Sequence, residues 1–363
     1  MARQPVACLP VASPPLPGQE YAGRLARCAS GCVERKRCVT DCRGIGGSCA
    51  TSSRALPPVE WTGVTRDGQT DVTEWGGRVP MPTRATPTER QKRLGAELRK
   101  MRLAAGRTTE YAAGLLGLDR TKVSNMELGI RSTSPERVRT LASNYDCSDQ
   151  RYVDALVELA NSRSRGWWEQ FRGSLPQGLL DVAELEWHAT RLRSEQAVHL
   201  PGPLQVGAYA SAIFDAALPP LTRSEVALRV IFRLHRQRIL ERDNPVDYVA
   251  YIHESALRMQ FGGRAVAREQ LRYLCEVSEL VNVEVRVLPV EAGAFPGAGH
   301  AVLYAEGVVP QLDTVQLDSA HGPEFTHADA QLAKYREHMD WMHAHTLGAL
   351  ESRDFIHNIV RQL

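Results

Sequence analysis

The sequence predicts a mainly α-helical chain with two folded domains, and three observations carry that prediction. Between residues 88 and 147, apolar residues recur at helical spacing between helix caps. After residue 245 the pattern changes to short strand-like runs between helices. Residues 1–85 are rich in Pro, Gly, Ser and Cys with no apolar period, so we expect a disordered leader there. We expect an all-α domain at 86–147, a linker helix at 148–164 and a larger mixed α/β domain with a small sheet at 165–363.

The leader holds six of the eight cysteines. Four of them, from Cys28 to Cys42, follow the spacing C-x3-C-x5-C-x3-C, which offers four thiolates to a zinc ion. The two pairs lie closer together than in known zinc frameworks, so we expect neither a metal nor a cofactor. Met81 stands directly before the first helical pattern, and a start there would leave residues 1–80 outside the native protein.

Charge is distributed unevenly along the 363 residues, although the net charge is only +2. Residues 81–146 carry thirteen Lys and Arg against seven Asp and Glu, whereas residues 147–363 carry twenty-one against twenty-eight. A basic segment beside an acidic one is typical of a nucleic-acid-binding module joined to a domain without that role. No apolar run is long enough for a signal peptide or a spanning helix, so we expect no membrane association and a cytoplasmic, nucleoid-associated protein.

Helix caps define four helices in the basic segment. Thr88 to Gln91 reads as a capping box, and Gly106 ends the helix that follows. A second helix is expected over 109–116. Asp119 is a suitable N-cap for a third helix that reaches about residue 128, and Ser134 with Pro135 opens a fourth.

The second and third helices have the spacing of a helix-turn-helix, with Ala113 small at the crossing, Gly117 at the turn, and Val123 and Met126 facing inward. The outward face of the third helix then carries polar side chains that suit a DNA groove. Arginine can bind guanine and asparagine adenine through two hydrogen bonds, while Ser and Thr bind base edges or phosphate. This face consists of Arg120, Thr121, Lys122, Ser124 and Asn125.

Residues 98–131 resemble the lambda-repressor-like, or xenobiotic response element (XRE), helix-turn-helix family. The match covers A-x-x-x-G at 113–117, V-S-x-M-E-x-G at 123–129, and Arg102 with Gly106. The resemblance implies that four residues read bases, namely Arg120, Thr121, Ser124 and Asn125. It implies a phosphate contact at Thr109, where the family has Gln or Ser, and a structural ion pair between Arg102 and Glu127. From charge and position we add Lys122 and Arg131 as phosphate contacts.

The acidic part is expected to begin with an amphipathic helix over 149–162. Trp167, Trp168 and Phe171 follow, and such clustered rings are more often a packed core than a ligand cage. Later helices are expected at 179–195, 205–217, 222–241, 266–280, 327–349 and 353–361. Strands are expected at 246–252, 283–289, 301–306 and 313–318.

This part resembles the domain of unknown function that follows such helix-turn-helix modules in many actinobacterial regulators. The resemblance lies in RGWW (165–168), LPGPLQVGAYA (200–210), RLHRQRIL (233–240) and VNVEVRVLP (281–289). It implies a regulatory or sensing domain, often with a small acidic partner protein encoded nearby, and it supplies no ligand. We expect the domain to respond to a small-molecule ligand or to such a partner.

Catalysis is not expected. His253 and Glu254 begin like the zinc motif H-E-x-x-H, but residue 257 is Leu, and the spacing of His338, His343 and His345 places His343 off the face of the other two. We expect a homodimer on double-stranded DNA, because one recognition helix covers few base pairs. Two alternatives stay open: an adaptor whose helix-turn-helix docks a protein partner, and a regulator fused to an uncharacterised enzyme domain.

Overall fold

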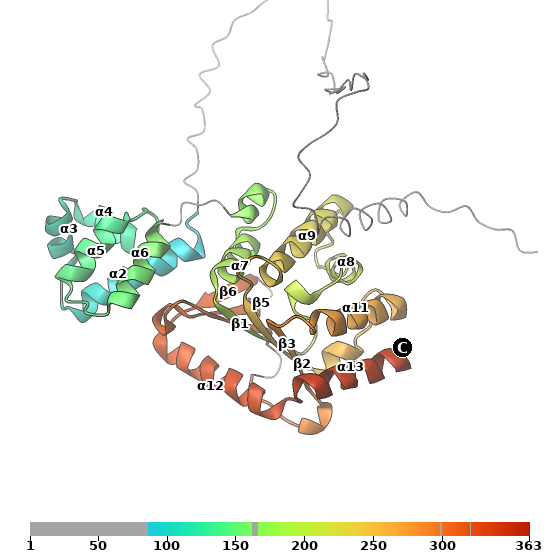
Figure 1. The fold of residues 1–363 in the computed structure, drawn as a ribbon. Coiled ribbons are helices and arrows are strands. Elements are labelled where there is room, and N and C mark those ends of the chain that lie inside the picture. Colours follow the sequence, from blue (N-terminus) through green and yellow to red (C-terminus); the bar gives the residue numbers. More distant parts are fainter. Residues whose placement is uncertain (1–85, 162–165, 298–299, 320) are drawn as a thin grey trace, which may run out of the picture. The chain divides into compact units, whose positions relative to one another are not determined.

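The computed structural model describes residues 86–161, 166–297, 300–319 and 321–363 (Figure 1). These residues form a helical N-terminal part and a mixed α/β part with one six-stranded sheet, which confirms the predicted fold class. The expectations for the leader, its cysteines and the start at Met81 concern residues outside this description.

The N-terminal part contains five helices, which are α2 (Glu89–Ala104), α3 (Thr109–Leu116), α4 (Arg120–Glu127), α5 (Pro135–Asn144) and α6 (Gln150–Asn161). Of these, α2, α4 and α5 begin at the predicted caps Thr88, Asp119 and Ser134. In the capping box, Thr88 Oγ1 accepts from Gln91 N (3.3 Å) and Gln91 Oε1 accepts from Thr88 N (3.0 Å). Asp119 caps α4 by accepting from Lys122 N (2.7 Å), and Ser134 caps α5 by accepting from Arg137 N (3.4 Å).

The five helices share one apolar core. Leu98 of α2, Val123 and Met126 of α4, Val138 of α5 and Leu156 of α6 are almost fully buried in it. Helix α6, which covers most of the segment expected to be a linker, therefore packs as the fifth helix of this core.

The C-terminal part is built on a mixed sheet with the strand order β3-β2-β1-β4-β5-β6. The strands β1, β2 and β3 are parallel, whereas β4, β5 and β6 continue the sheet in antiparallel pairs. Their bounds are β1 (Arg191–Gln196), β2 (Asp247–His253), β3 (Val283–Leu288), β4 (Val302–Glu306), β5 (Thr314–Ser319) and β6 (Gly322–Thr326).

Helices cover both faces of this sheet (Figure 1). One face packs on α8 (Gly207–Asp215), α11 (Arg264–Val277) and α13 (Ala349–Gln362) through residues such as Tyr248 and Ala250. The other face packs on α12 (Asp329–His345) through Tyr251 and Tyr304. Alternate residues of a strand point to opposite faces of the sheet. Because helices cover both faces, the residues on each face are buried.

Three further helical elements complete this part: α7 (Gln177–His188), α9 (Arg223–Arg236) and the short α10 (Glu254–Arg258). The 3-10 turn η1 (Trp167–Phe171) buries Trp168 and Phe171 against Phe232 of α9, so the aromatic cluster is a packed core, as predicted.

The prediction of one helix over 179–195 was wrong. Helix α7 ends at His188, and residues 191–196 form β1 in the middle of the sheet. The strand RLRSEQ lacks the apolar alternation of a half-buried strand because its charged residues are buried in ion pairs. Arg193 contacts Glu306 (3.0 Å) and Asp340 (2.7 Å), and Glu195 pairs with His338. Strand β6 and helix α10 were not predicted.

Candidate nucleic-acid interface

The turn between α3 and α4 holds the two helices in the predicted geometry. Gly117 adopts a left-handed conformation with φ of +61°, and the next amide, Leu118 N, donates to Ala113 O (2.9 Å). Ala113 is buried at the crossing, and Val123 and Met126 are each 2% exposed. One side of α4 is therefore anchored in the core.

Helix α4 also lies directly against α2. A Cβ atom on Gly95 of α2 would meet Glu127 O at 2.5 Å and Met126 O at 2.6 Å. Any side chain at position 95 would push the end of α4 away. The backbone of α4 is thus positioned by contact with α2 as well as by its own turn.

The opposite side of α4 is open to solvent and carries the predicted polar residues. Arg120, Thr121 and Lys122 are exposed, and Ser124 and Asn125 are partly exposed. Residues four apart share a helix face, so Arg120 lies above Ser124 and Thr121 above Asn125. The structure brings the four residues assigned to base reading onto one continuous surface.

Arg120 is paired with an acidic residue of α3. Its Nη1 lies 3.0 Å from Oε1 of Glu110, and both side chains are more than half exposed. The hydrogen bond from Arg120 is the main reason why the pKa of Glu110 lies below its usual value. DNA would have to compete with this carboxylate for the guanidinium.

Lys122 is likewise paired with an acidic neighbour. Its Nζ lies 2.8 Å from Oδ2 of Asp119, whose Oδ1 accepts from Lys122 N (2.7 Å) at the start of α4. These bonds from Lys122 lower the pKa of Asp119. The pair is about half exposed, so a phosphate can reach Lys122.

The other two residues assigned to phosphate flank α3 and α4. Thr109 is the first residue of α3 and is partly exposed, while the cap of that helix is Thr108, whose Oγ1 accepts from Tyr111 N (3.1 Å). Arg131 is exposed beyond the end of α4, and its backbone N–H donates to Asn125 O (3.0 Å).

Arg102 and Glu127 connect α2 to the end of α4 below this surface. Arg102 Nε and Nη2 donate to the two carboxylate oxygens of Glu127 at 2.6 and 2.9 Å, and Nη1 donates to Arg107 O (2.9 Å). The two side chains are only 8% and 10% exposed. They hold α4 in place and do not face solvent.

Sequence reasoning did not single out Arg107, which follows the helix-ending Gly106. Arg107 is exposed, and its guanidinium lies 4.8 Å from the ring centroid of Tyr111 on α3. It adds a cation near Thr109. Its position in a loop of the basic segment was the feature of the sequence that could have identified Arg107 as a candidate DNA contact.

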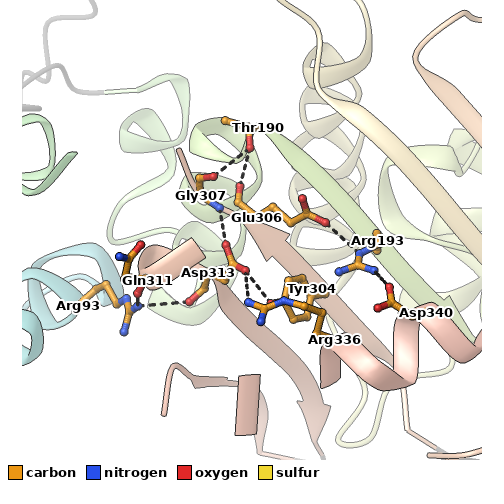
Figure 2. A network of polar contacts seen from close by, with 10 residues as sticks. All are labelled: Arg93, Thr190, Arg193, Tyr304, Glu306, Gly307, Gln311, Asp313, Arg336 and Asp340. Atoms are coloured by element: carbon orange, nitrogen blue, oxygen red, sulfur yellow. Dashed lines mark hydrogen bonds and ion pairs between the residues drawn. The ribbon is translucent and has the colours of Figure 1, made fainter. Parts of the chain in front are cut away.

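Arg93 of α2 binds the C-terminal part of the chain (Figure 2). Its Nη2 donates to the carbonyl oxygen of Gln311 and to that of Asp313 (3.4 Å), and its side chain pairs with Glu97 (2.8 Å). Arg93 is 6% exposed. Helix α2 of the helical core is thus hydrogen-bonded to the loop that precedes β5.

That loop is fixed by the side chain of Asp313 (Figure 2). Its carboxylate accepts from Tyr304 Oη (2.7 Å), Arg336 Nη2 (2.9 Å) and Gly307 N (3.1 Å). Hydrogen bonds therefore run from α12 and β4 through the loop to Arg93. The pattern of the sequence contained no signal for this network, because its members are far apart along the chain.

The fold and the surface of α4 define a helix-turn-helix protein of the kind that inserts a helix into a DNA groove. Residues 93–156 match the family described as a helix-turn-helix domain, and residues 179–358 match a family described as a domain of unknown function, DUF5753. The chain therefore combines an XRE-like helix-turn-helix domain with a C-terminal DUF5753 domain. No curated protein and no solved structure matches it.

The helix-turn-helix domain indicates a DNA-binding regulator. Among the helices of the described residues, none is long and apolar enough to cross a membrane.

Proposed function

We propose that the chain is a dimeric, sequence-specific transcription regulator whose C-terminal domain senses a ligand or a partner protein. The observation that carries the proposal is the outward face of α4, where Arg120 and Asn125 stand on a helix anchored by Val123, Met126 and the Arg102–Glu127 pair. Both side chains can form two hydrogen bonds with one base, which suits sequence reading in the major groove.

Charge supports the same proposal. The segment 81–146 has six more basic than acidic residues, and Lys122 and Arg131 flank the reading surface. Contacts of such cations with phosphates supply affinity without sequence preference, so they complement the base contacts.

Dimerisation follows from the size of the surface. One helix of eight residues, α4, reads few base pairs. Two copies on half-sites about 34 Å apart would supply the missing affinity and specificity.

Regulation is the role we propose for the C-terminal domain, with Arg93 as one connection to the helix-turn-helix. We propose no catalytic role. His253 Nδ1 accepts from Ser255 N (3.2 Å) and so caps α10, and His338 pairs with Glu195 under the sheet. These contacts give both histidines a structural role, and we need no catalytic role to explain their presence.

Selection of DNA from a random pool by the purified full-length chain tests the proposal. We expect an enriched inverted repeat, and a mass of two chains per DNA by light scattering. Enrichment of no sequence would contradict sequence-specific binding and favour the adaptor. A single half-site bound by one chain would contradict the dimer.

A further inference from the structure

The C-terminal domain contains a cavity of about 240 Å³ on the sheet face that packs on α8. Ser194 and Gln196, in the carboxyl half of β1, form part of its wall. Strand β1 has the parallel β2 on one side and the antiparallel β4 on the other. Strands β2 and β3 are added on one side of β1 and β4 to β6 on the other, so the strand order reverses at β1. Ligands of open α/β sheets bind at the carboxyl ends of strands beside such a switch.

Two arginines of α9 enter this cavity, and only one of them has a carboxylate partner. Arg236 donates to both oxygens of Glu186 at 2.8 and 2.6 Å. Arg233 donates to the neutral Gln205 Oε1 (2.8 Å), and its guanidinium lies 5.1 Å from the ring centroid of Phe214. Within the described residues, no carboxylate lies within ion-pair distance of Arg233.

The partner of Arg233 is itself fixed. Gln205 is 1% exposed, and its Nε2 donates to Leu200 O (2.6 Å), so its amide oxygen points to Arg233. Gln237 Nε2 holds the backbone oxygen of Gln205 at 2.8 Å. A Cβ atom on Gly202 would lie 2.9 Å from Arg236 Nη2, which shows how closely the 201–205 turn covers that guanidinium.

The other polar groups of the wall are compatible with a negatively charged ligand. Tyr248 Oη donates to Ser194 Oγ (3.1 Å), so the hydroxyl proton of Ser194 is available to an acceptor. Asp318 is exposed at the rim and accepts from Gln316 Nε2 (2.8 Å), so water screens its charge. Burial lowers the pKa of Arg233 to about 9, and Arg236 adds to this effect, yet Arg233 remains a cation at neutral pH.

We infer that this cavity binds a small organic monocarboxylate, whose carboxylate pairs with Arg233 and whose apolar part contacts Leu200, Ile213 and Leu303. The planar guanidinium matches a carboxylate through two parallel hydrogen bonds. One uncompensated positive charge favours a monoanion. The volume lies below the roughly 300–1,000 Å³ of pockets for drug-sized molecules, so the ligand is small. This inference rests on the proposed sensing role of the domain.

Thermal unfolding of the full-length chain with acetate, butyrate and benzoate, each compared with its uncharged primary amide at constant ionic strength, tests the inference. We expect at least one acid to raise the Tm more than its amide does. The variant Arg233→Gln should raise the dissociation constant of that acid about tenfold or more, because a charge-assisted pair is lost. The matched control Arg223→Gln changes the exposed first residue of α9 and should bind like the parent.

Equal effects of every acid and its amide, or an unchanged dissociation constant in Arg233→Gln, would overturn the inference. If that variant does not fold, as judged by circular dichroism, NMR of the arginine Nε–Hε groups in the unsubstituted chain replaces it. The signal of Arg233 should then move with the acid and not with the amide, and an unmoved signal would overturn the inference. DNA binding is measured separately without acid, so either proposal can fail while the other stands.

Discussion

The guanidinium of Arg120 on α4 lies 3.0 Å from the carboxylate of Glu110 on α3, on the surface assigned to DNA. The chain thus supplies its own anion to the side chain best suited to bind guanine. In the proposed complex, DNA would displace this carboxylate or share the guanidinium with it.

Replacing Glu110 with Gln should strengthen DNA binding. The substitution removes the competing anion and a negative charge that faces the DNA, so we expect binding about twofold to fivefold tighter at low salt, and a smaller gain at high salt. Fluorescence anisotropy on the selected operator at two salt concentrations measures this. Weaker binding by Glu110→Gln would mean that Glu110 positions Arg120 for the DNA.

Arg120→Ala and Asn125→Ala should each weaken binding to the selected operator by about 1–3 kcal/mol and relax the base preference at one position. Affinities for operators with single base changes measure both effects. The exposed Arg151 of α6 provides the control, since Arg151→Ala should leave the base preference unchanged. An equal loss on every sequence would contradict a base-reading role.

Lys122→Ala should weaken binding to all sequences alike and reduce the slope of log K against log salt by about 1. We expect the same of Arg131→Ala, while Thr109→Val, which removes an uncharged donor, should leave the slope unchanged. Affinity over a range of salt concentrations gives the slopes. A slope that Lys122→Ala does not alter would remove Lys122 from the phosphate contacts.

Glu127→Ala should destabilise the helix-turn-helix. It leaves Arg102, whose side chain is 8% exposed, without its carboxylate, and breaking a buried pair in this way costs about 3 kcal/mol. Urea denaturation measures the free energy of unfolding, with the exposed Glu158→Ala as control. If both variants lose equally little, the Arg102–Glu127 pair does not stabilise the native state.

Glu184→Gln should change how stability depends on pH. Burial raises the pKa of Glu184 from 4.5 to about 7; Asp181 acts in the same direction and Arg90 opposes it. Since the native carboxyl binds its proton more tightly than the unfolded one, the contribution of Glu184 to the free energy of unfolding should fall as pH rises from 4.5 to 7.

His188 has the opposite effect on the same measurement, because burial lowers its pKa to about 4. The difference between parent and Glu184→Gln isolates Glu184. We expect this difference to change by roughly 3 kcal/mol in favour of the variant between pH 4.5 and 8. Parallel pH profiles of the two proteins would show that the pKa of Glu184 is not raised.

The helical part of the chain could be predicted closely because its signals are local. Thr88, Asp119 and Ser134 each cap a helix within three residues of their own position, and Gly117 forms the turn that its place in the sequence requires. The outward face of α4 follows from the same periodicity. Val123 and Met126 point into the core, so Ser124 and Asn125 between them, and Arg120 and Thr121 one turn earlier, point to solvent.

Strand β1 shows where local signals fail. A helix was expected over 179–195, yet Arg193 and Glu195 lie in a strand and are buried, because Glu306 of β4 and His338 and Asp340 of α12 contact them. A buried charge is stable only with its partner in place, and the sequence does not state which partner that is.

By itself, the sequence determined the helix-turn-helix, the caps of α2, α4 and α5, and the residues that α4 presents to solvent, because each depends on contacts within a few residues. Tertiary structure alone decided that 191–196 is a central strand, that Arg93 binds the loop before β5, and that Arg233 faces a cavity without a carboxylate partner among the described residues. These features depend on groups that lie far apart along the chain and meet only when the sheet and its helices pack together.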